Sequence, residues 1–354
     1  MRRALELARR GWGRVAPNPL VGAVLCQGGR IVGEGYHAEF GGPHAEVRAL
    51  DACADPAGST CVVTLEPCAH TGKTAPCADA LIAAGVARVV FALKDPDPEA
   101  GGGGQRLREA GIDVEEGLCR EEAAALNAPF LWLKRRPERP FVALKLATSL
   151  DGFLTDKRGR SRWISGPPAC AWVHWLRAGY DAVAVGRRTA EVDDPQLTVR
   201  GSLEPRTAPK RVVFARTGPV QPELHVVRTA GETPTIVITS PGSAPAVTAA
   251  LRSTAVEVHG ARDLTDGLRV LRGLGIGSLL VEGGGMLAGA LLEAGLVDRL
   301  YWIQAPLWLG EGTPAFGRRT ATLLEDARSW TVVERGELGV DTLLVVDREP
   351  CLPE

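Results

Sequence analysis

The chain has 354 residues, too many for one ordinary hydrophobic core, and its length predicts two domains. Hydrophobic residues make up 45% of the sequence and the formal net charge is −1, so no global charge attracts nucleic acid or an anionic membrane surface. No apolar run approaches the ~18 residues of a membrane span, and no signal peptide is recognisable. We therefore expect a cytoplasmic protein with no nucleic-acid or membrane partner, whose eight cysteines are thiols or metal ligands.

The first half of the chain alternates strands with helices. Pro43 favours the first turn of a helix that carries His44 to Val47, and Pro76 favours the start of another that continues through Ala84. Alternation of this kind predicts a layered α/β domain. A further helix is expected over 3–10, and strands over 21–26, 30–36, 60–65 and 88–93.

A charged segment with two prolines, 134–140, is the best candidate for a domain boundary. We predict one domain over residues 1–137 and a second over 138–354. The second domain again alternates strands with helical stretches, which predicts another α/β fold. Its expected strands cover 141–147, 182–185, 211–214, 235–239 and 278–281.

The strongest chemical signal is a set of metal-binding residue types followed by an acid. A catalytic zinc site uses three protein ligands and leaves one position for water. His44, Cys68 and Cys77 supply one imidazole and two thiolates, which cancel the charge of the ion and let a bound water ionise near neutral pH. Glu46 is the expected catalytic acid/base, which carries the water's proton to a ring nitrogen and then to leaving ammonia.

Other interpretations of this pattern remain open. Zinc deaminases share the order H-x-E then P-C-x-x-C, whereas eight residues separate the two cysteines here. A structural zinc site would need a fourth ligand, such as His70 or Cys61, and gives the acid no role. A nucleic-acid deaminase would need a basic stripe and stacking aromatics, but aromatic residues make up only 5% of the chain. A non-catalytic, zinc-stabilised binding protein is the third alternative.

A glycine-rich turn near the end of the second domain predicts phosphate binding. A strand leads into Glu282 and three glycines, 283–285, and a helix follows. Glycines let the backbone approach a pyrophosphate, and a helix start favours its negative charge. Because the turn comes last in its domain, we interpret it as the phosphate loop of a reductase-like sheet and not as a Rossmann fingerprint. A tight turn without a ligand is the alternative.

Two pairs of side chains complete the predictions made from residue chemistry. Arg177 and Arg200 are candidates for holding a substrate phosphate, because a guanidinium can contact phosphate through two hydrogen bonds. Lys145 and Asp151 flank a Ser-Leu motif and are candidates for proton transfer.

Taken together, the motifs resemble the RibD family of bifunctional riboflavin-biosynthesis enzymes, in which a pyrimidine deaminase is joined to a reductase. The long-spaced run P-C-A-H-T-G-K-T-A-P-C at 67–77 is a hallmark of that family, and 16–22 and 35–37 also match its deaminase half. The resemblance covers roughly residues 1–345. The reductase half is matched at 146–152, 161–165, 193–200 and 281–285.

This resemblance implies a cytidine-deaminase-like three-layer domain followed by a dihydrofolate-reductase-like α/β domain. It implies zinc-dependent hydrolytic deamination of 2,5-diamino-6-ribosylamino-4(3H)-pyrimidinone 5′-phosphate. NADPH-dependent reduction of the ribosyl group would follow and give 5-amino-6-ribitylamino-uracil 5′-phosphate. The expected cofactors are one Zn²⁺ per deaminase site and NADPH, and the expected assembly is a homo-oligomer.

The resemblance also implies individual contacts. Deaminase substrate contacts are Asn18, His37 and Lys73. Reductase substrate contacts are Ser161, Arg177, Leu197, Arg200 and Glu282. Coenzyme contacts are Ala147, Trp163, Thr189, Asp193, Gly284, Gly285, Met286, Leu287, Ala288, Gly289 and Ala290.

Overall fold

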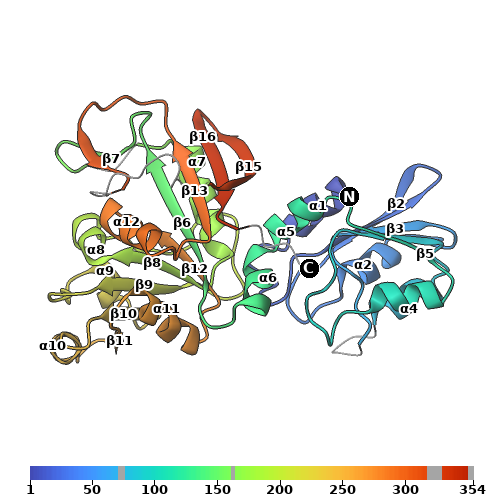
Figure 1. The fold of residues 1–354 in the computed structure, drawn as a ribbon, viewed down its shortest axis with the longest axis horizontal. Helices are drawn as coiled ribbons and strands as arrows, with labels where there is room; N and C mark the ends of the chain where they lie inside the picture. Colours follow the sequence, from blue (N-terminus) through green and yellow to red (C-terminus); the bar gives the residue numbers. More distant parts are fainter. Residues whose placement is uncertain (71–75, 161–163, 317–328, 350–354) are drawn as a thin grey trace. The chain divides into compact units, whose positions relative to one another are not determined.

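The structure, a computed structural model, describes residues 1–70, 76–160, 164–316 and 329–349. These residues divide into two compact units, one within Met1–Arg136 and the other Pro137–Glu349 (Figure 1). Each unit has its own sheet and its own apolar core. The mixed α/β class expected from the alternating pattern is confirmed in both.

The first unit is built on a five-stranded sheet with the order β2-β1-β3-β4-β5. β1 pairs antiparallel with β2 and β3, and β4 and β5 extend the sheet in parallel. The strands are β1 (Gly22–Gln27), β2 (Arg30–Tyr36), β3 (Thr60–Val63), β4 (Arg88–Phe91) and β5 (Asp113–Glu116). The helices are α1 (Arg2–Arg9), α2 (Ala45–Asp51), α3 (Cys77–Ala83), α4 (Gly103–Glu109), α5 (Arg120–Leu126) and α6 (Ala128–Arg135).

Glycines let helices lie directly on both faces of this sheet. A Cβ on Gly22 would come within 2.0 Å of the Ala4 carbonyl oxygen, so α1 presses on β1 there. A Cβ on Gly35 would come within 2.4 Å of the Ala45 carbonyl oxygen, so α2 presses on β2. Gly35 is paired with Ala23, the residue after Gly22, and successive strand residues face opposite sides. α1 and α2 therefore cover opposite faces, and the three-layer prediction is confirmed.

The second unit contains a nine-stranded sheet with the order β11-β10-β9-β8-β12-β6-β13-β16-β15 (Figure 1). All neighbours from β11 to β13 are parallel, and β16 and β15 are added antiparallel. The strands are β6 (Phe141–Thr148), β8 (Ala182–Gly186), β9 (Lys210–Ala215), β10 (Thr235–Thr239), β11 (Glu257–Gly260), β12 (Ser278–Glu282), β13 (Arg299–Gln304), β15 (Thr331–Leu338) and β16 (Asp341–Asp347).

Helices and a short ribbon complete the second unit. β7 (Phe153–Asp156) and β14 (Gly312–Pro314) form a separate antiparallel pair. The helices are α7 (Pro167–Ala178), α8 (Arg187–Asp193), α9 (His225–Arg228), α10 (Ala244–Ala250), α11 (Leu264–Gly273) and α12 (Gly285–Glu293). None of the helices in the described part of the chain has the length and hydrophobicity that a membrane span requires. The seven cysteines described are free thiols.

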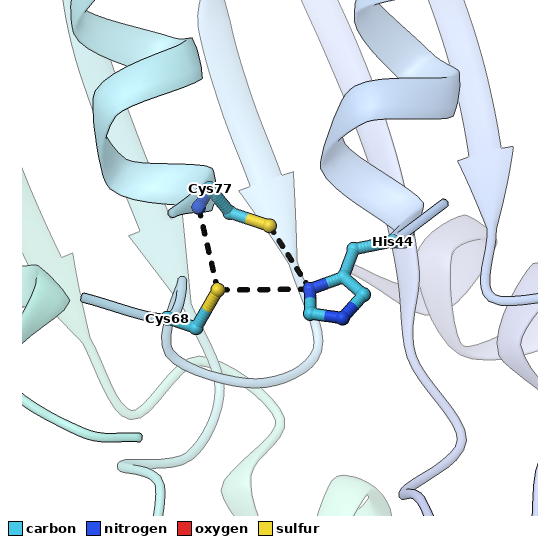
Figure 2. Close-up of side chains that lie close together, drawn as sticks. All are labelled: His44, Cys68 and Cys77. Carbon is cyan, nitrogen blue, oxygen red and sulfur yellow. Dashed lines mark hydrogen bonds between the residues drawn. The ribbon is translucent and has the colours of Figure 1, made fainter. Parts of the chain in front are cut away.

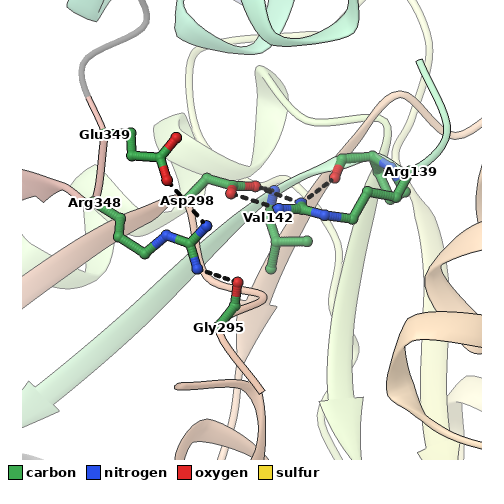
Figure 3. A network of polar contacts seen from close by, with 7 residues as sticks. Arg139, Val142, Gly295, Asp298, Arg348 and Glu349 are labelled. Carbon is green, nitrogen blue, oxygen red and sulfur yellow. Dashed lines mark hydrogen bonds and ion pairs between the residues drawn. The ribbon is translucent and has the colours of Figure 1, made fainter. Parts of the chain in front are cut away.

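A buried ion pair joins the start of the second unit to the turn before β13 (Figure 3). Arg139, just before β6, donates to both carboxylate oxygens of Asp298 at 2.7 and 2.8 Å. Asp298 also accepts from the Val142 backbone N–H at 2.8 Å, and its own carbonyl accepts from the backbone N–H of Arg348 at 2.9 Å. The Arg348 guanidinium in turn donates to the Gly295 carbonyl. The turn before β13 is thus tied to both β6 and the end of β16.

We expect Asp298→Ala to lower the free energy of unfolding by about 3–5 kcal/mol, because it leaves a guanidinium and a backbone N–H buried without their acceptor. Equilibrium urea unfolding measures this change. Glu223→Ala, which removes an exposed acid from the same unit, should stay within about 0.5 kcal/mol of the parent. Equal stability of both variants would contradict the role of the pair.

Candidate active sites

The three predicted zinc ligands meet at two helix starts in the first unit. His44 is the N-cap of α2, Cys77 is the first residue of α3, and Cys68 lies in the loop after β3. The His44 Nδ1 atom is 3.1 Å from the Cys77 sulfur and 3.6 Å from the Cys68 sulfur (Figure 2). All three ligand atoms lie within 4.8 Å of one another. Pro43 and Pro76, each just before a ligand, favour these helix starts.

The electrostatics of this cluster suit a divalent cation. Hydrogen bonds from the Cys77 side chain and from His44, together with the Cys77 backbone N–H at 3.3 Å, lower the pKa of the Cys68 thiol. These contacts favour the thiolate, the form that binds metal. One imidazole nitrogen and two sulfurs form a three-ligand set typical of catalytic zinc. The residues present fit the ion.

Glu46 lies in the first turn of α2 and is only 3% exposed. Its burial raises the pKa of the carboxyl group to about 7. A carboxyl group with a pKa near neutrality can both take up and release a proton, which is the requirement for general acid/base catalysis. Glu46 is not one of the three clustered metal-ligating groups.

Two predicted substrate contacts lie beside the cluster. The His37 ring packs edge-on against His44, with ring centres 5.5 Å apart. Its Nδ1 is 3.2 Å from the Pro43 carbonyl and its Nε2 is 3.2 Å from the Asn18 amide nitrogen. Burial lowers the pKa of His37, so the neutral ring donates to Pro43 and accepts from Asn18. The third predicted contact, Lys73, lies outside the described residues.

The alternative of a closed structural site finds no fourth ligand within the described residues. Cys61 is fully buried among apolar side chains of the core, and His70 is exposed. Neither belongs to the cluster of His44, Cys68 and Cys77.

The second unit carries a cleft of about 1360 Å³ at the carboxyl ends of its parallel strands. Such ends are where open α/β sheets bind ligands. The cleft is larger than a sugar phosphate needs and offers room for a dinucleotide as well. Predicted site residues that line it are Lys145, Ala147, Arg177, Thr189, Asp193, Leu197, Glu282, Gly284, Gly285, Met286, Leu287 and Ala290.

The cleft lining includes three charged groups that lie together: Arg177 is buried, and Lys145 and Glu282 are half-buried. Arg177 of α7 donates to both oxygens of Glu282, at 2.5 and 2.9 Å, and to the Thr198 carbonyl at 2.8 Å. Lys145 is the register partner of Glu282 on the neighbouring strand. Burial lowers the pKa of Lys145, so this ammonium releases a proton more readily than a solvated one.

The glycine turn forms the middle of the cleft. The Gly284 backbone N–H donates to the Thr189 hydroxyl at 3.1 Å, which joins the turn to α8. A Cβ on Gly285 would lie 2.5 Å from the Pro314 carbonyl oxygen, so only glycine fits there. Gly285 is therefore packed against the backbone of residues 314–315. α12 begins beside the cleft, and a helix start of this kind favours a pyrophosphate.

Several predicted residues lie elsewhere. Ala288 and Gly289 are buried and do not line the cleft, and Ala288 packs in the apolar core. Asp151 also lies outside the cleft lining, and its carboxylate instead accepts from Ser149 and from the backbone N–H groups of Leu309 and Gly310. Arg200 is exposed and is likewise not a lining residue. Ser161 and Trp163 lie outside the described residues.

Sequence reasoning missed three residues that the structure places at the sites. Glu66 precedes Cys68 by two positions and is buried, and Arg216 and Ser240 follow β9 and β10 at the cleft. The signal for Arg216 and Ser240 was present, because each lies within two residues of the end of an expected strand. For Glu66 the only signal was an acid close to a metal ligand.

A three-ligand nitrogen–sulfur cluster beside a buried acid defines a zinc deaminase centre, and a glycine-lined cleft at parallel strand ends defines a nucleotide-coenzyme reductase. Comparison with known proteins agrees with both halves. The model of the cytidine and deoxycytidylate deaminase zinc-binding region matches residues 1–93, and that of the RibD C-terminal domain matches residues 140–336.

Whole-chain relatives carry both halves. The riboflavin biosynthesis protein RibD of Escherichia coli is 43% identical, over 97% of each chain, and that of Aquifex aeolicus is 42% identical over 88% of this chain and 87% of its own. RibD of Acinetobacter baumannii superposes with a TM-score of 0.80 at 35% identity. The deaminase/reductase of Thermotoga maritima superposes with a TM-score of 0.81 at 36% identity. In each structural comparison the match covers 98% of this chain and 97% of the other.

The chain therefore belongs to the RibD family. It is a bifunctional deaminase and reductase of riboflavin biosynthesis, and its cofactors are Zn²⁺ and NADPH.

We expect Cys77→Ser to lose most of its bound zinc, because an alcohol oxygen replaces a thiolate ligand. Metal analysis of the purified protein measures the loss, and reductase activity should persist. The matched control is Cys61→Ala, which removes another buried thiol of the same unit and should keep one zinc per chain. Zinc loss in the control, with retention in Cys77→Ser, would reverse the ligand assignment.

Proposed function

We propose that the first unit deaminates the pyrimidine ring of 2,5-diamino-6-ribosylamino-4(3H)-pyrimidinone 5′-phosphate and that the second reduces the ribosyl group of the product. The observation that carries the first step is the buried Glu46 beside the cluster of His44, Cys68 and Cys77. The name of the Thermotoga maritima relative, a diaminohydroxyphosphoribosylaminopyrimidine deaminase and 5-amino-6-(5-phosphoribosylamino)uracil reductase, supports both substrates.

In the deaminase, His44, Cys68 and Cys77 would hold the zinc, which activates water for attack on the ring carbon. Glu46 takes one proton from the attacking water and passes it to the ring nitrogen. It then takes the second proton from the added hydroxyl and delivers it to the departing amine as the ring carbonyl forms. His37 and Asn18, fixed to each other, orient the ring from one side. Lys73 is assigned to the substrate by its place in the family motif.

In the reductase, NADPH supplies the hydride. Glu282, held by Arg177, contacts the ribosyl group, and Lys145 delivers the proton that the reduced sugar oxygen takes up. Leu197 lines the same cleft, and Ser161 and Arg200 are assigned to the substrate by the family motif. Asp151 keeps a supporting role, because its carboxylate holds the Leu309–Gly310 backbone.

Residues at the strand ends would hold the coenzyme. Ala147 would contact its nicotinamide end, and Thr189 with the turn 284–287 would bind the pyrophosphate. Asp193 and Ala290 line the same channel, and Trp163, Ala288 and Gly289 are assigned by motif alone.

Residues at the ends of β9 to β11 would hold the adenosine end of the coenzyme. Arg216 and Ser240 line the cleft there, and the Ser240 N–H donates to the Arg216 carbonyl at 3.1 Å. Arg262 is already paired with Asp266, but within the described residues Arg216 has no carboxylate partner. An unpaired guanidinium beside a hydroxyl fits the 2′-phosphate that distinguishes NADPH from NADH.

We propose further that the enzyme is a cytoplasmic homo-oligomer and that its domain boundary lies between residues 137 and 138. The family resemblance supports the homo-oligomer, and the charged segment 134–140 with its two prolines supports the boundary. Its partners are small molecules and not nucleic acid, which the net charge of −1 supports.

Glu46→Gln should keep its zinc and lose deaminase activity by about 10²–10⁴-fold, because the amide cannot move a proton. Ammonia release from the pyrimidine ribotide and metal content are the two measurements. Asp51→Asn, an exposed acid at the end of the same helix, should leave both unchanged. If Glu46→Gln lost its metal, Glu46 would have to be counted as a ligand.

Arg216→Met should weaken NADPH binding by about tenfold or more, the effect of losing one charge-assisted contact, and leave NADH binding unchanged. Calorimetric titration with each coenzyme measures the ratio. Arg252→Met, an exposed arginine that does not line the cleft, is the matched control. An equal loss of affinity for both coenzymes would place Arg216 away from the 2′-phosphate.

A further inference from the structure

The loop between β4 and α4, residues 92–102, lies directly against the segment that carries Cys68. The Glu66 backbone N–H donates to the Leu93 carbonyl at 2.7 Å, and the Ala69 N–H donates to the Ala100 carbonyl at 3.1 Å. These bonds bracket Cys68 on both sides. The segment 66–69 is therefore attached to the loop at two points, one before and one after the metal ligand.

The Glu66 side chain adds a second layer of attachment. Its Oε1 atom accepts from the Gly104 N–H at 2.9 Å, in the first turn of α4, and its Oε2 atom accepts from the Asp95 N–H at 3.2 Å. Glu66 is 9% exposed. The Glu66 carboxylate thus bonds both to the loop, at Asp95, and to the first turn of α4, at Gly104. Its negative charge suits the positive end of a helix.

Gly103 makes the closest backbone approach in this region. A Cβ built on it would lie 1.7 Å from the Pro67 carbonyl oxygen and 2.8 Å from the Pro67 carbonyl carbon. No side chain fits at that distance, and the obstacle is backbone that a rotamer change cannot move. The start of α4 therefore sets the position of the peptide bond that leads into Cys68.

We propose that Glu66 and Gly103 are positioning residues that hold Cys68 in place for metal binding, so that the loop 92–102 and the start of α4 form the support of the deaminase centre. The inference rests on the proposed ligand set His44, Cys68 and Cys77. The Cys68 carbonyl and sulfur are also bound by the N–H groups of Ala78 and Cys77, at 3.2 and 3.3 Å. Cys68 is thus clamped between α3 and the loop, which leaves the thiolate little freedom to move.

The first test is Glu66→Gln in the full-length enzyme. Its amide group can accept only one of the two N–H bonds, because the other position now carries hydrogens. Groups that orient metal ligands typically contribute 10–100-fold to metal affinity, so we expect zinc affinity to fall by about that factor in competition with a chromogenic chelator. With Co²⁺ in place of zinc, the thiolate-to-cobalt absorption band should shift or broaden. The reductase rate, measured on the same sample, should be unchanged.

Two matched controls separate positioning from general damage. Glu99→Gln makes the same change at an exposed position of the same loop and should bind zinc like the parent. Gly103→Ala should reproduce the loss of affinity, whereas Gly101→Ala, whose added Cβ meets no atom closer than 3.3 Å, should not.

Thermal unfolding with and without zinc decides between the two roles. A positioning role predicts that the increase in Tm on adding zinc is smaller in Glu66→Gln than in the parent, in addition to any fall in the zinc-free Tm that the unpaired N–H causes. The inference is overturned if both Tm values fall equally, or if Glu66→Gln binds zinc and cobalt as the parent does. Absence of zinc binding in the parent would instead overturn the ligand set itself.

Discussion

The deaminase centre depends on one constraint, that two helices must begin at the same point above the sheet. His44 can meet the sulfurs of Cys68 and Cys77 only if α2 lies close to β2 and α3 starts beside it. Gly35 allows this approach, because a side chain there would strike the Ala45 carbonyl, one residue after His44. A backbone contact in the sheet layer thus sets where a metal ligand lies. The same approach buries Glu46, and its burial gives the carboxyl group a proton affinity near neutrality.

The second unit uses a different means to assemble a site. Its ligand contacts come from the ends of parallel strands, so each strand delivers the residue that follows it to one edge of the sheet. Lys145 and Glu282 meet there because β6 and β12 are neighbours in register. The bond between Arg177 and Glu282 keeps a carboxylate charged in buried surroundings. Chemistry and coenzyme binding are consequently spread along a cleft, whereas the metal centre is concentrated at a point.

Much of this was predictable from the sequence, and the failures have physical causes. The ligands His44, Cys68 and Cys77 and the acid Glu46 could be identified because their residue types and spacing are rare outside metal chemistry. The strand expected over residues 30–36 has the bounds of β2 in the structure. The ribbon of β7 with β14 and the antiparallel strands β15 and β16 were missed, because their pairing depends on partners far along the chain. The role assigned to Asp151 followed from its neighbours in sequence, whereas its hydrogen bonds to Leu309 and Gly310 are a tertiary contact.

The position of β6 in its sheet has a consequence for biosynthesis. β6 is the first strand of the second unit, yet its two neighbours are β12 and β13, which emerge from the ribosome more than 130 residues later. The sheet of the first unit is complete by Glu116, so that unit can fold while the chain is still being made. The apolar strand β6 stays without its neighbours until β12 and β13 have been synthesised. Nascent chains with such unpaired strands are prone to aggregation in that interval. A chaperone that shelters this strand during translation would act on the reductase half alone.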